Sequence, residues 1–145
     1  SNAGVRFLQD GPNGSIDRGR TGFLLATPLA PLCPENAPIL RDIARSSAKR
    51  NSVDMAMTLN LISDRILEAV VSAHFNRNSE REVASAHVFI KEITEAYCAR
   101  GFYPYRVNIE QMKDIVPHGT PLRESINHIR KAFDPNLVLA PGRYE

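Results

Sequence analysis

The chain has 145 residues, the length of one domain or of a part of a larger protein. Hydrophobic residues make up 43% and charged residues 23%, so the chain can bury one core and has the composition of a globular protein. The net charge is only +2, and Lys and Arg are spread along the sequence, which argues against nucleic acid as a partner.

The N-terminal twenty residues are predicted to lie outside the fold. Residues 1–3, Ser-Asn-Ala, are typical of the remnant of an expression tag. Residues 4–20 contain the turn-forming run "DGPNGS" and show no apolar period. We therefore expect residues 4–20 to be a loop severed from a longer chain.

A strand, a helix and a hairpin are predicted next. The apolar run "TGFLLATPLA" at 21–30 is typical of a buried strand, and prolines stop it from continuing. After Asn36, apolar residues recur at helical spacing and basic residues gather at the end, which predicts a helix. Residues 53–61 and 67–75 alternate apolar with polar side chains, and the short connection at 63–65 makes them an antiparallel hairpin.

A second helix and a final strand complete the predicted domain. In "EREVASAHVFIKEITEAYCAR" the apolar residues form one stripe, and Gly101 supplies the C-terminal stop. Residues 102–108 are expected to be extended, because the residue before Pro104 is kept out of the helical region. The order strand, helix, strand, strand, helix, strand predicts an α+β, ferredoxin-like βαββαβ antiparallel sheet with helices on one face.

A helical extension is predicted after the sheet. Residues 108–115 are expected to form a short helix. A longer helix then begins with Thr120 as cap and Pro121 at its first position, and its apolar stripe is Leu122, Ile126, Ile129 and Phe133. The tail "LVLAPGRYE" carries three consecutive aliphatic residues, so we expect it to dock on protein, with Arg143 either aimed inward by a turn at Gly142 or exposed.

Common catalytic and metal-binding patterns are missing from the sequence. The four histidines have no carboxylate at ligand spacing, so surface or packing roles are expected for them, and no metal site is predicted. Cys33 and Cys98 form no CxxC pair and are expected to be packing thiols. Asp54 and Glu68 are expected to lie on a solvated sheet face. No run of about 18 apolar residues occurs, which predicts no transmembrane helix and no membrane partner.

One segment stands out chemically, "GFYPYRVN" at 101–108. On a strand, Tyr105 and Arg106 would point to opposite faces. A buried arginine must find an anion or water, because an unpaired buried guanidinium is very costly. Two interpretations are open at this point: an edge strand with Arg106 in a surface salt bridge, or a site where the guanidinium and the phenol hold an anion or an electron-rich ring.

The motifs "YRVN" at 105–108, "RESINHIRKAFDPN" and the ending "LVLAPGRY" resemble the C-terminal part of the p-cresol methylhydroxylase and vanillyl-alcohol oxidase family of FAD-linked oxidases. The strand with "TPLAP", followed by helix, hairpin and helix, is similar to that family's cap, or substrate, domain. The resemblance implies that 21–108 is part of a cap domain. It also implies that 109–145 packs on an FAD-binding domain that this chain lacks.

The resemblance implies a role for each of three residues. Tyr105 would hydrogen-bond the substrate phenol oxygen, and Arg143 would help to hold the phenolate. Arg106 would lie beside the pyrimidine edge of FAD. The parent protein would then oxidise a 4-substituted phenol by hydride transfer from the benzylic carbon to the flavin, and the isolated fragment would be inactive.

The resemblance further implies a phenolic substrate, oxygen or a cytochrome c as electron acceptor, and a homo-oligomer; the compartment, cytoplasmic or periplasmic, stays open. Three departures concern the choice of phenol and the flavin linkage. No His or Tyr precedes position 74, so a covalent flavin anchor is not found in 4–20. Ala69 to Val71 stand where paired histidines are expected, and a carboxylate expected near Thr58 is absent.

Two other functions remain as alternatives. One is an FAD-linked 2-hydroxy-acid dehydrogenase, in which Arg106 or Arg143 would hold the substrate carboxylate. The other is a ferredoxin-like binding module without chemistry, for which a tidy N-terminus rather than a severed loop would be expected.

Overall fold

The computed structural model describes residues 19–115 and 118–141. These residues fall into two compact units that divide between Arg106 and Val107. We call them the sheet unit (19–106) and the C-terminal unit (107–141) and describe each by itself. The predicted tag remnant and most of the predicted loop at 4–20 lie outside the described residues.

The sheet is antiparallel and is built around its longest strand, β4. β1 and β2 pair with one side of β4 and β3 pairs with the other. β1 and β2 keep a single register against β4, since Ala26 pairs with Val71 and Leu29 with Glu68. They are therefore two halves of the one strand predicted at 21–30. The strands are β1 (Thr21–Ala26), β2 (Leu29–Pro31), β3 (Asp54–Leu61) and β4 (Ile66–Asn76).

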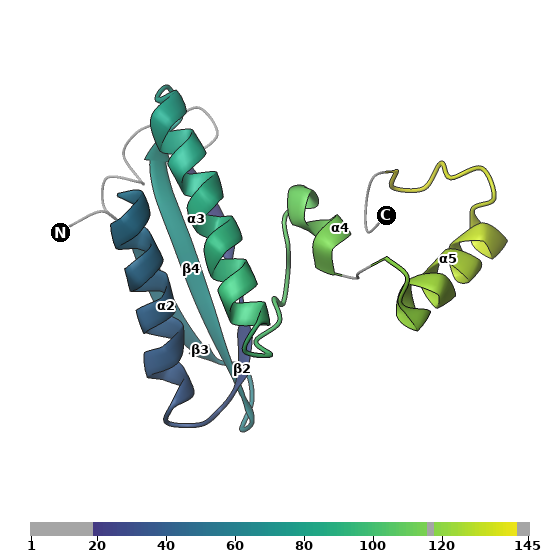
Figure 1. Cartoon of the computed structure of the whole chain (residues 1–145), viewed down its shortest axis with the longest axis horizontal. Helices are drawn as coiled ribbons and strands as arrows, with labels where there is room; N and C mark the ends of the chain where they lie inside the picture. The colour runs from purple at the N-terminus through teal and green to yellow at the C-terminus, as the bar shows by residue number, and fades with distance from the viewer. Residues whose placement is uncertain (1–18, 116–117, 142–145) are drawn as a thin grey trace. The chain divides into compact units, whose positions relative to one another are not determined.

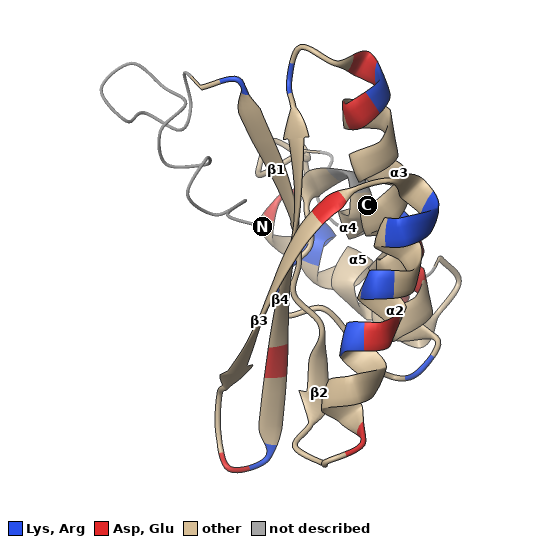
Figure 2. Cartoon of the chain, turned by 90° about the vertical axis from the view of Figure 1, so that its left-hand side faces the viewer, with Lys and Arg blue, Asp and Glu red and all other residues tan. Residues whose placement is uncertain are grey.

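Two helices, α2 (Asn36–Asn51) and α3 (Glu80–Cys98), cover one face of this sheet (Figures 1 and 2). Ser79 caps α3, because its side chain accepts a hydrogen bond from the Glu82 backbone N–H. Gly101, just beyond the end of α3, has φ 79°, a left-handed conformation that favours glycine. Figure 2 shows that many charged residues of the sheet unit belong to these helices, while the strands carry few.

The core lies between the helices and the sheet. β4 contributes small side chains, Ala69, Val71 and Ala73, which are fully buried and leave room for Phe89 and Tyr97 of α3. Burying one such large apolar side chain contributes roughly 1.5–3 kcal/mol. The Tyr97 hydroxyl donates to the Leu40 carbonyl at 2.8 Å, which ties α3 to α2, and burial raises the pKa of this phenol.

The last predicted strand, 102–108, is much shorter than expected. It forms a single antiparallel bridge between Pro28 and Pro104, with the Leu29 N–H donating to the Tyr103 carbonyl at 2.8 Å. The two prolines face each other as a non-hydrogen-bonded pair, whose flanking bonds come from the Leu29 and Tyr105 N–H groups, and the ladder stops because the chain bends at 105–106. Phe102 still enters the core. The predicted α+β fold, an antiparallel sheet with helices on one face, is confirmed.

The C-terminal unit is helical, as predicted. It contains η3 (Ile109–Gln111), α4 (Met112–Ile115) and α5 (Pro121–Phe133). Thr120 caps α5 by accepting a hydrogen bond from the Arg123 N–H at 3.3 Å, with Pro121 in the first turn. No helix in the ranges that the structure describes is long and apolar enough to cross a membrane.

Candidate functional site

The face of the sheet opposite α2 and α3 is covered by no helix of the sheet unit, and we call it the open face (Figure 2). Because cross-strand partners lie on the same face, the register assigns its residues. Two of its apolar residues, Phe23 and Leu25, are 38% and 42% exposed. The open face consists of Phe23, Leu25, Thr27 and Leu29, of Asp54, Ala56, Thr58 and Asn60, and of Glu68, Val70, Ser72 and His74.

Thr27 holds the Tyr105–Arg106 dipeptide at the edge of this face. The Tyr105 N–H donates to the Thr27 carbonyl at 2.7 Å. The Thr27 side chain bonds the backbone of Arg106 twice, since Oγ1 lies 3.2 Å from both the Arg106 N and the Arg106 O. The backbone of both residues is thereby fixed to the sheet, while both side chains are exposed.

Arg106 and Tyr105 do not point to opposite faces, so that prediction is wrong. The Arg106 guanidinium carbon lies 5.5 Å from the centroid of the Tyr105 ring. The strand alternation stops here because the chain bends at 105–106, directly after the Pro104 bridge. A cation over an exposed ring contributes about 0.5–1 kcal/mol. The result is a guanidinium and a phenol hydroxyl presented together, both open to a ligand. Tyr103 is also mostly exposed.

Glu68 is buried, which corrects the expectation of a solvated carboxylate. Only 9% of the residue is exposed, whereas Asp54 at the end of β3 is exposed as predicted. The Asn60 side-chain amide donates to Glu68 Oε2 at 3.0 Å across the β3–β4 pair. The alternation of β4 puts Glu68 between Ile66 and Val70 on one face, and this apolar setting was the signal that the sequence analysis overlooked.

Arg143, the third predicted site residue, lies outside the described residues, as does Gly142. The chain before them is held by Asp134, which is buried and ends α5. Its carboxylate accepts from the Val138 N–H at 2.9 Å and from the Leu139 N–H at 2.8 Å. The aliphatic tail residues themselves are exposed, so the docking predicted for them stays a prediction.

The histidines and cysteines form no site in the parts of the chain that the structure describes. No three His, Cys, Asp or Glu side chains gather there as they would around a metal ion. His74 lies on the open face opposite Asp54 and is partly buried. Cys33 and Cys98 are free thiols, and burial raises the pKa of the Cys98 thiol.

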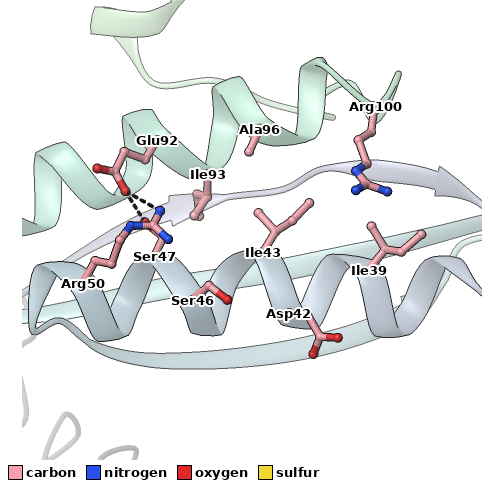
Figure 3. Close-up of a pocket in the computed structure, with 10 residues that line it drawn as sticks. All are labelled: Ile39, Asp42, Ile43, Ser46, Ser47, Arg50, Glu92, Ile93, Ala96 and Arg100. Atoms are coloured by element: carbon pink, nitrogen blue, oxygen red, sulfur yellow. Dashed lines mark hydrogen bonds and ion pairs between the residues drawn. The ribbon is translucent and has the colours of Figure 1, made fainter.

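A hollow of about 430 Å³ lies between α2 and α3, on the helix side of the sheet (Figure 3). At one end Glu92 Oε2 accepts from Ser47 Oγ at 2.6 Å, from Asn51 Nδ2 at 3.0 Å and from Arg50 Nη2 at 3.1 Å. These donors, Ser47 first, lower the pKa of the Glu92 carboxyl. Because Glu92 Oε2 already accepts hydrogen bonds from three side chains of α2, this cluster serves to join the two helices. It is separate from the Tyr105–Arg106 edge.

Two curated proteins are similar to the chain in sequence, while no protein-family model matches it. The 1'-carboxy-chondrochloren decarboxylase of Chondromyces crocatus is 24% identical over 129 residues, 89% of this chain and 24% of the relative. The 4-cresol dehydrogenase [hydroxylating] flavoprotein subunit of Pseudomonas putida is 27% identical over 84 residues, 57% of this chain and 16% of the relative. The chain thus spans a quarter or less of the length of these relatives.

Two solved structures share the fold. The 4-ethylphenol oxidase from Gulosibacter chungangensis, in complex with isoeugenol, matches 86% of this chain with a TM-score of 0.79 and 17% identity. The p-cresol methylhydroxylase with substrate bound matches 85% with a TM-score of 0.78 and 22% identity. In each case the match covers 24% of the other chain. These findings confirm the predicted resemblance: the chain is similar to the cap-like part of the p-cresol methylhydroxylase and vanillyl-alcohol oxidase family.

Proposed function

We propose that this chain is the cap and C-terminal portion of an FAD-dependent oxidoreductase that oxidises a 4-substituted phenol at its benzylic carbon. The observation that carries the proposal is the Tyr105–Arg106 pair, fixed by Thr27 at the edge of the open face. It is supported by the shared fold with a 4-ethylphenol oxidase and a p-cresol methylhydroxylase.

Tyr105 would act on the phenol oxygen of the substrate. Loss of hydride from a benzylic carbon is easier when the phenol is ionised, because the product is then a neutral quinone methide. A fixed hydroxyl donor aimed at the oxygen favours the phenolate without having to reorganise. The Tyr105 N–H bonds the Thr27 carbonyl, which fixes the backbone position from which the Tyr105 hydroxyl extends. Arg143 is proposed as a second donor to the same oxygen.

Arg106 would hold the cofactor edge. A reduced flavin carries negative charge at its N1–C2 carbonyl edge, and an exposed, permanently charged guanidinium on a fixed backbone suits that charge. The donor set therefore fits FAD. When bound, the flavin supplies the hydride acceptor; this chain supplies the cation, the phenol donor and the open face that shields the reacting carbon from water.

The remaining part of FAD binding would come from a separate domain. Residues 21–108 would form part of the cap, and 109–145 would pack on the FAD-binding domain. Apolar side chains of α5 support this assignment, since Leu122 and Ile129 are exposed and Phe133 is 83% exposed. We therefore expect the isolated chain to turn over no phenol.

A second candidate is the loss of a carboxyl group as CO₂ from a carboxylated substrate. The relative that covers 89% of this chain is named a decarboxylase, which is the observation that favours it. In that case Arg106 or Arg143 would bind the substrate carboxylate, as in the alternative 2-hydroxy-acid dehydrogenase.

The test is to express the full-length protein that contains this chain and to record its flavin spectrum. Anaerobic 4-alkylphenols are expected to bleach the flavin, whereas 2-hydroxy acids are not. Release of CO₂ from a carboxylated phenol would favour the second candidate. Absence of flavin absorbance, or no bleaching with any phenol, would disprove the proposed function. Re-oxidation by oxygen compared with cytochrome c then identifies the electron acceptor.

A further inference from the structure

Glu68 is a largely buried residue, and only one of its two carboxylate oxygens accepts a hydrogen bond from a described residue. Asn60 donates to Oε2, and Oε1 has no hydrogen-bond partner among the described residues. Oε1 is not sealed inside the protein and is open to a ligand or to water on the open face. A carboxylate oxygen in such surroundings is stabilised by a further donor, since buried polar groups are costly when unmet. Glu68 therefore presents one oriented acceptor on the open face.

The sheet register places this acceptor in line with the Tyr105 edge. Glu68 pairs with Leu29, and the Leu29 N–H bonds the Tyr103 carbonyl. Tyr105 lies opposite Thr27, two strand spacings of roughly 4.8 Å from β4 and two residues along the strand from Leu29, so about 12 Å separates its backbone from that of Glu68. A phenol with a short para substituent, hydrogen-bonded at both ends, has about this length.

We propose that Glu68, oriented by Asn60, is a specificity-determining residue that selects phenols whose para substituent carries a hydrogen-bond donor. This inference rests on the proposed function, in which Tyr105 binds the phenol oxygen at the other end of the ring. A hydroxyl or amide N–H on the substituent donates to Glu68 Oε1. A carboxylate on the substituent is rejected, because two like charges meet at close range in a partly desolvated place.

The selection follows from the residue's immediate neighbours. Ile66, Val70 and Leu29 surround Glu68 on the open face and offer no donor from their side chains. A hydrogen bond to Oε1 must therefore come from the para substituent of the substrate or from water. An analogue that covers Oε1 without donating to it, or that opposes it with a second anion, binds more weakly.

The experiment compares two non-reacting ligands that differ only in the substituent, 4-hydroxybenzamide as donor and 4-hydroxybenzoate as anion. Their Kd values for the oxidised full-length holoenzyme are measured by calorimetry and by flavin spectral change. The wild type is expected to bind the amide at least about tenfold more tightly. Glu68→Gln keeps the bond from Asn60 to the side-chain oxygen and turns the free position into an N–H donor. The ratio of the Kd for 4-hydroxybenzoate to the Kd for 4-hydroxybenzamide is therefore expected to fall by about tenfold or more.

Two further variants separate this effect from charge and from folding. Glu95→Gln, an exposed glutamate of α3 paired with Lys91, removes the same charge on the helix side and is expected to leave the ratio unchanged. Asn60→Ala keeps the carboxylate but removes its orienting donor, and is expected to lower the preference for the amide by about threefold.

An unchanged Kd ratio in Glu68→Gln, with 4-alkylphenols still bleaching the flavin, would overturn this inference and leave the proposed function standing. If no phenol bleaches the wild-type flavin, the proposed function fails and the inference fails with it. If Glu68→Gln does not fold, Asn60→Ala decides: a ratio equal to the wild type's overturns the proposal.

Discussion

The two faces of the sheet differ sharply although the same strands build both. On the covered face, Ala69, Val71 and Ala73 of β4 are fully buried beneath α2 and α3. On the open face, the intervening residues of β4 include Glu68, Ser72 and His74, and the neighbouring Leu25 is substantially exposed. One strand thus supplies apolar contacts on one side and polar groups on the other.

This difference shows how a single hairpin separates stability from function. Because side chains alternate with period two, a residue on one face can change without disturbing the other, provided the register is kept. The covered face is therefore expected to determine the free energy of unfolding, and the open face to determine which ligand binds. Four predictions test that division, beginning with the largest effect.

The first prediction tests whether the covered face determines the free energy of unfolding. Phe89→Ala removes a ring that is fully buried and is expected to lower the free energy of unfolding by about 3–5 kcal/mol. Phe23→Ala, on the open face, is the matched control and is expected to cost less than half as much. Denaturant titration of both variants measures the difference, and equal losses would contradict the division.

The open face should show the reverse pattern, with activity lost and stability kept. In the proposed site, Arg106→Met at the edge of the open face removes the cation beside the flavin and is expected to slow flavin reduction by a phenol about 100-fold in the full-length protein. Since Arg106 is exposed, the unfolding midpoint should not move. Arg100→Met, in the hollow between the helices, is the control. A similar rate loss in both variants would show that any lost arginine has this effect.

The helix layer provides a pH test. Ser47→Ala removes the shortest hydrogen bond to Glu92 and is expected to cost about 1–2 kcal/mol at pH 7. The folded pKa of Glu92 lies below its ordinary value of 4.5, so this contribution is present above pH 4.5 and is lost as the pH falls through the folded pKa. Unfolding at pH 7 and pH 3 should show the gap between wild type and variant narrowing; a constant gap would contradict the assignment.

The smallest effect is expected on the open face itself. Leu25→Thr should change the free energy of unfolding by no more than about 0.5 kcal/mol, because the side chain is already 42% exposed. Leu40→Thr, at a fully buried position of α2, is the matched comparison and should be strongly destabilising. If the two variants melt alike, the open face is covered within this chain, and the site proposed there would have to be abandoned.

Local signals in the sequence predicted most of the fold. The cap at Thr120 and the stop at Gly101 depend on residues within one helical turn, so they were recognised without the structure. The alternation in β3 and β4 is equally local. The 102–108 strand was overestimated because its length depends on pairing with residues 27–29, far away in the sequence, and on the bend at 105–106.

The site was predicted less completely because it depends on contacts between distant residues. Tyr105 and Arg106 stood out by composition, yet the clamp from Thr27 and the stacking of the two side chains follow from the bridge at Pro104. Glu68 was taken for a solvated residue because its burial depends on Asn60 and Leu29, which come from two other strands. The role of Arg143 stays a prediction.

The two edges of the sheet have consequences for how this chain behaves at high concentration. Beside β2, the prolines at 28, 31 and 104 leave few free N–H groups, which blocks further strands from adding there. β3, in contrast, is eight residues long and contains no proline, and no described strand pairs with its outer side. An edge of this kind is a template for a strand from another molecule, so preparations of the isolated chain should self-associate through β3. A lysine introduced at Ala56 would suppress that aggregation.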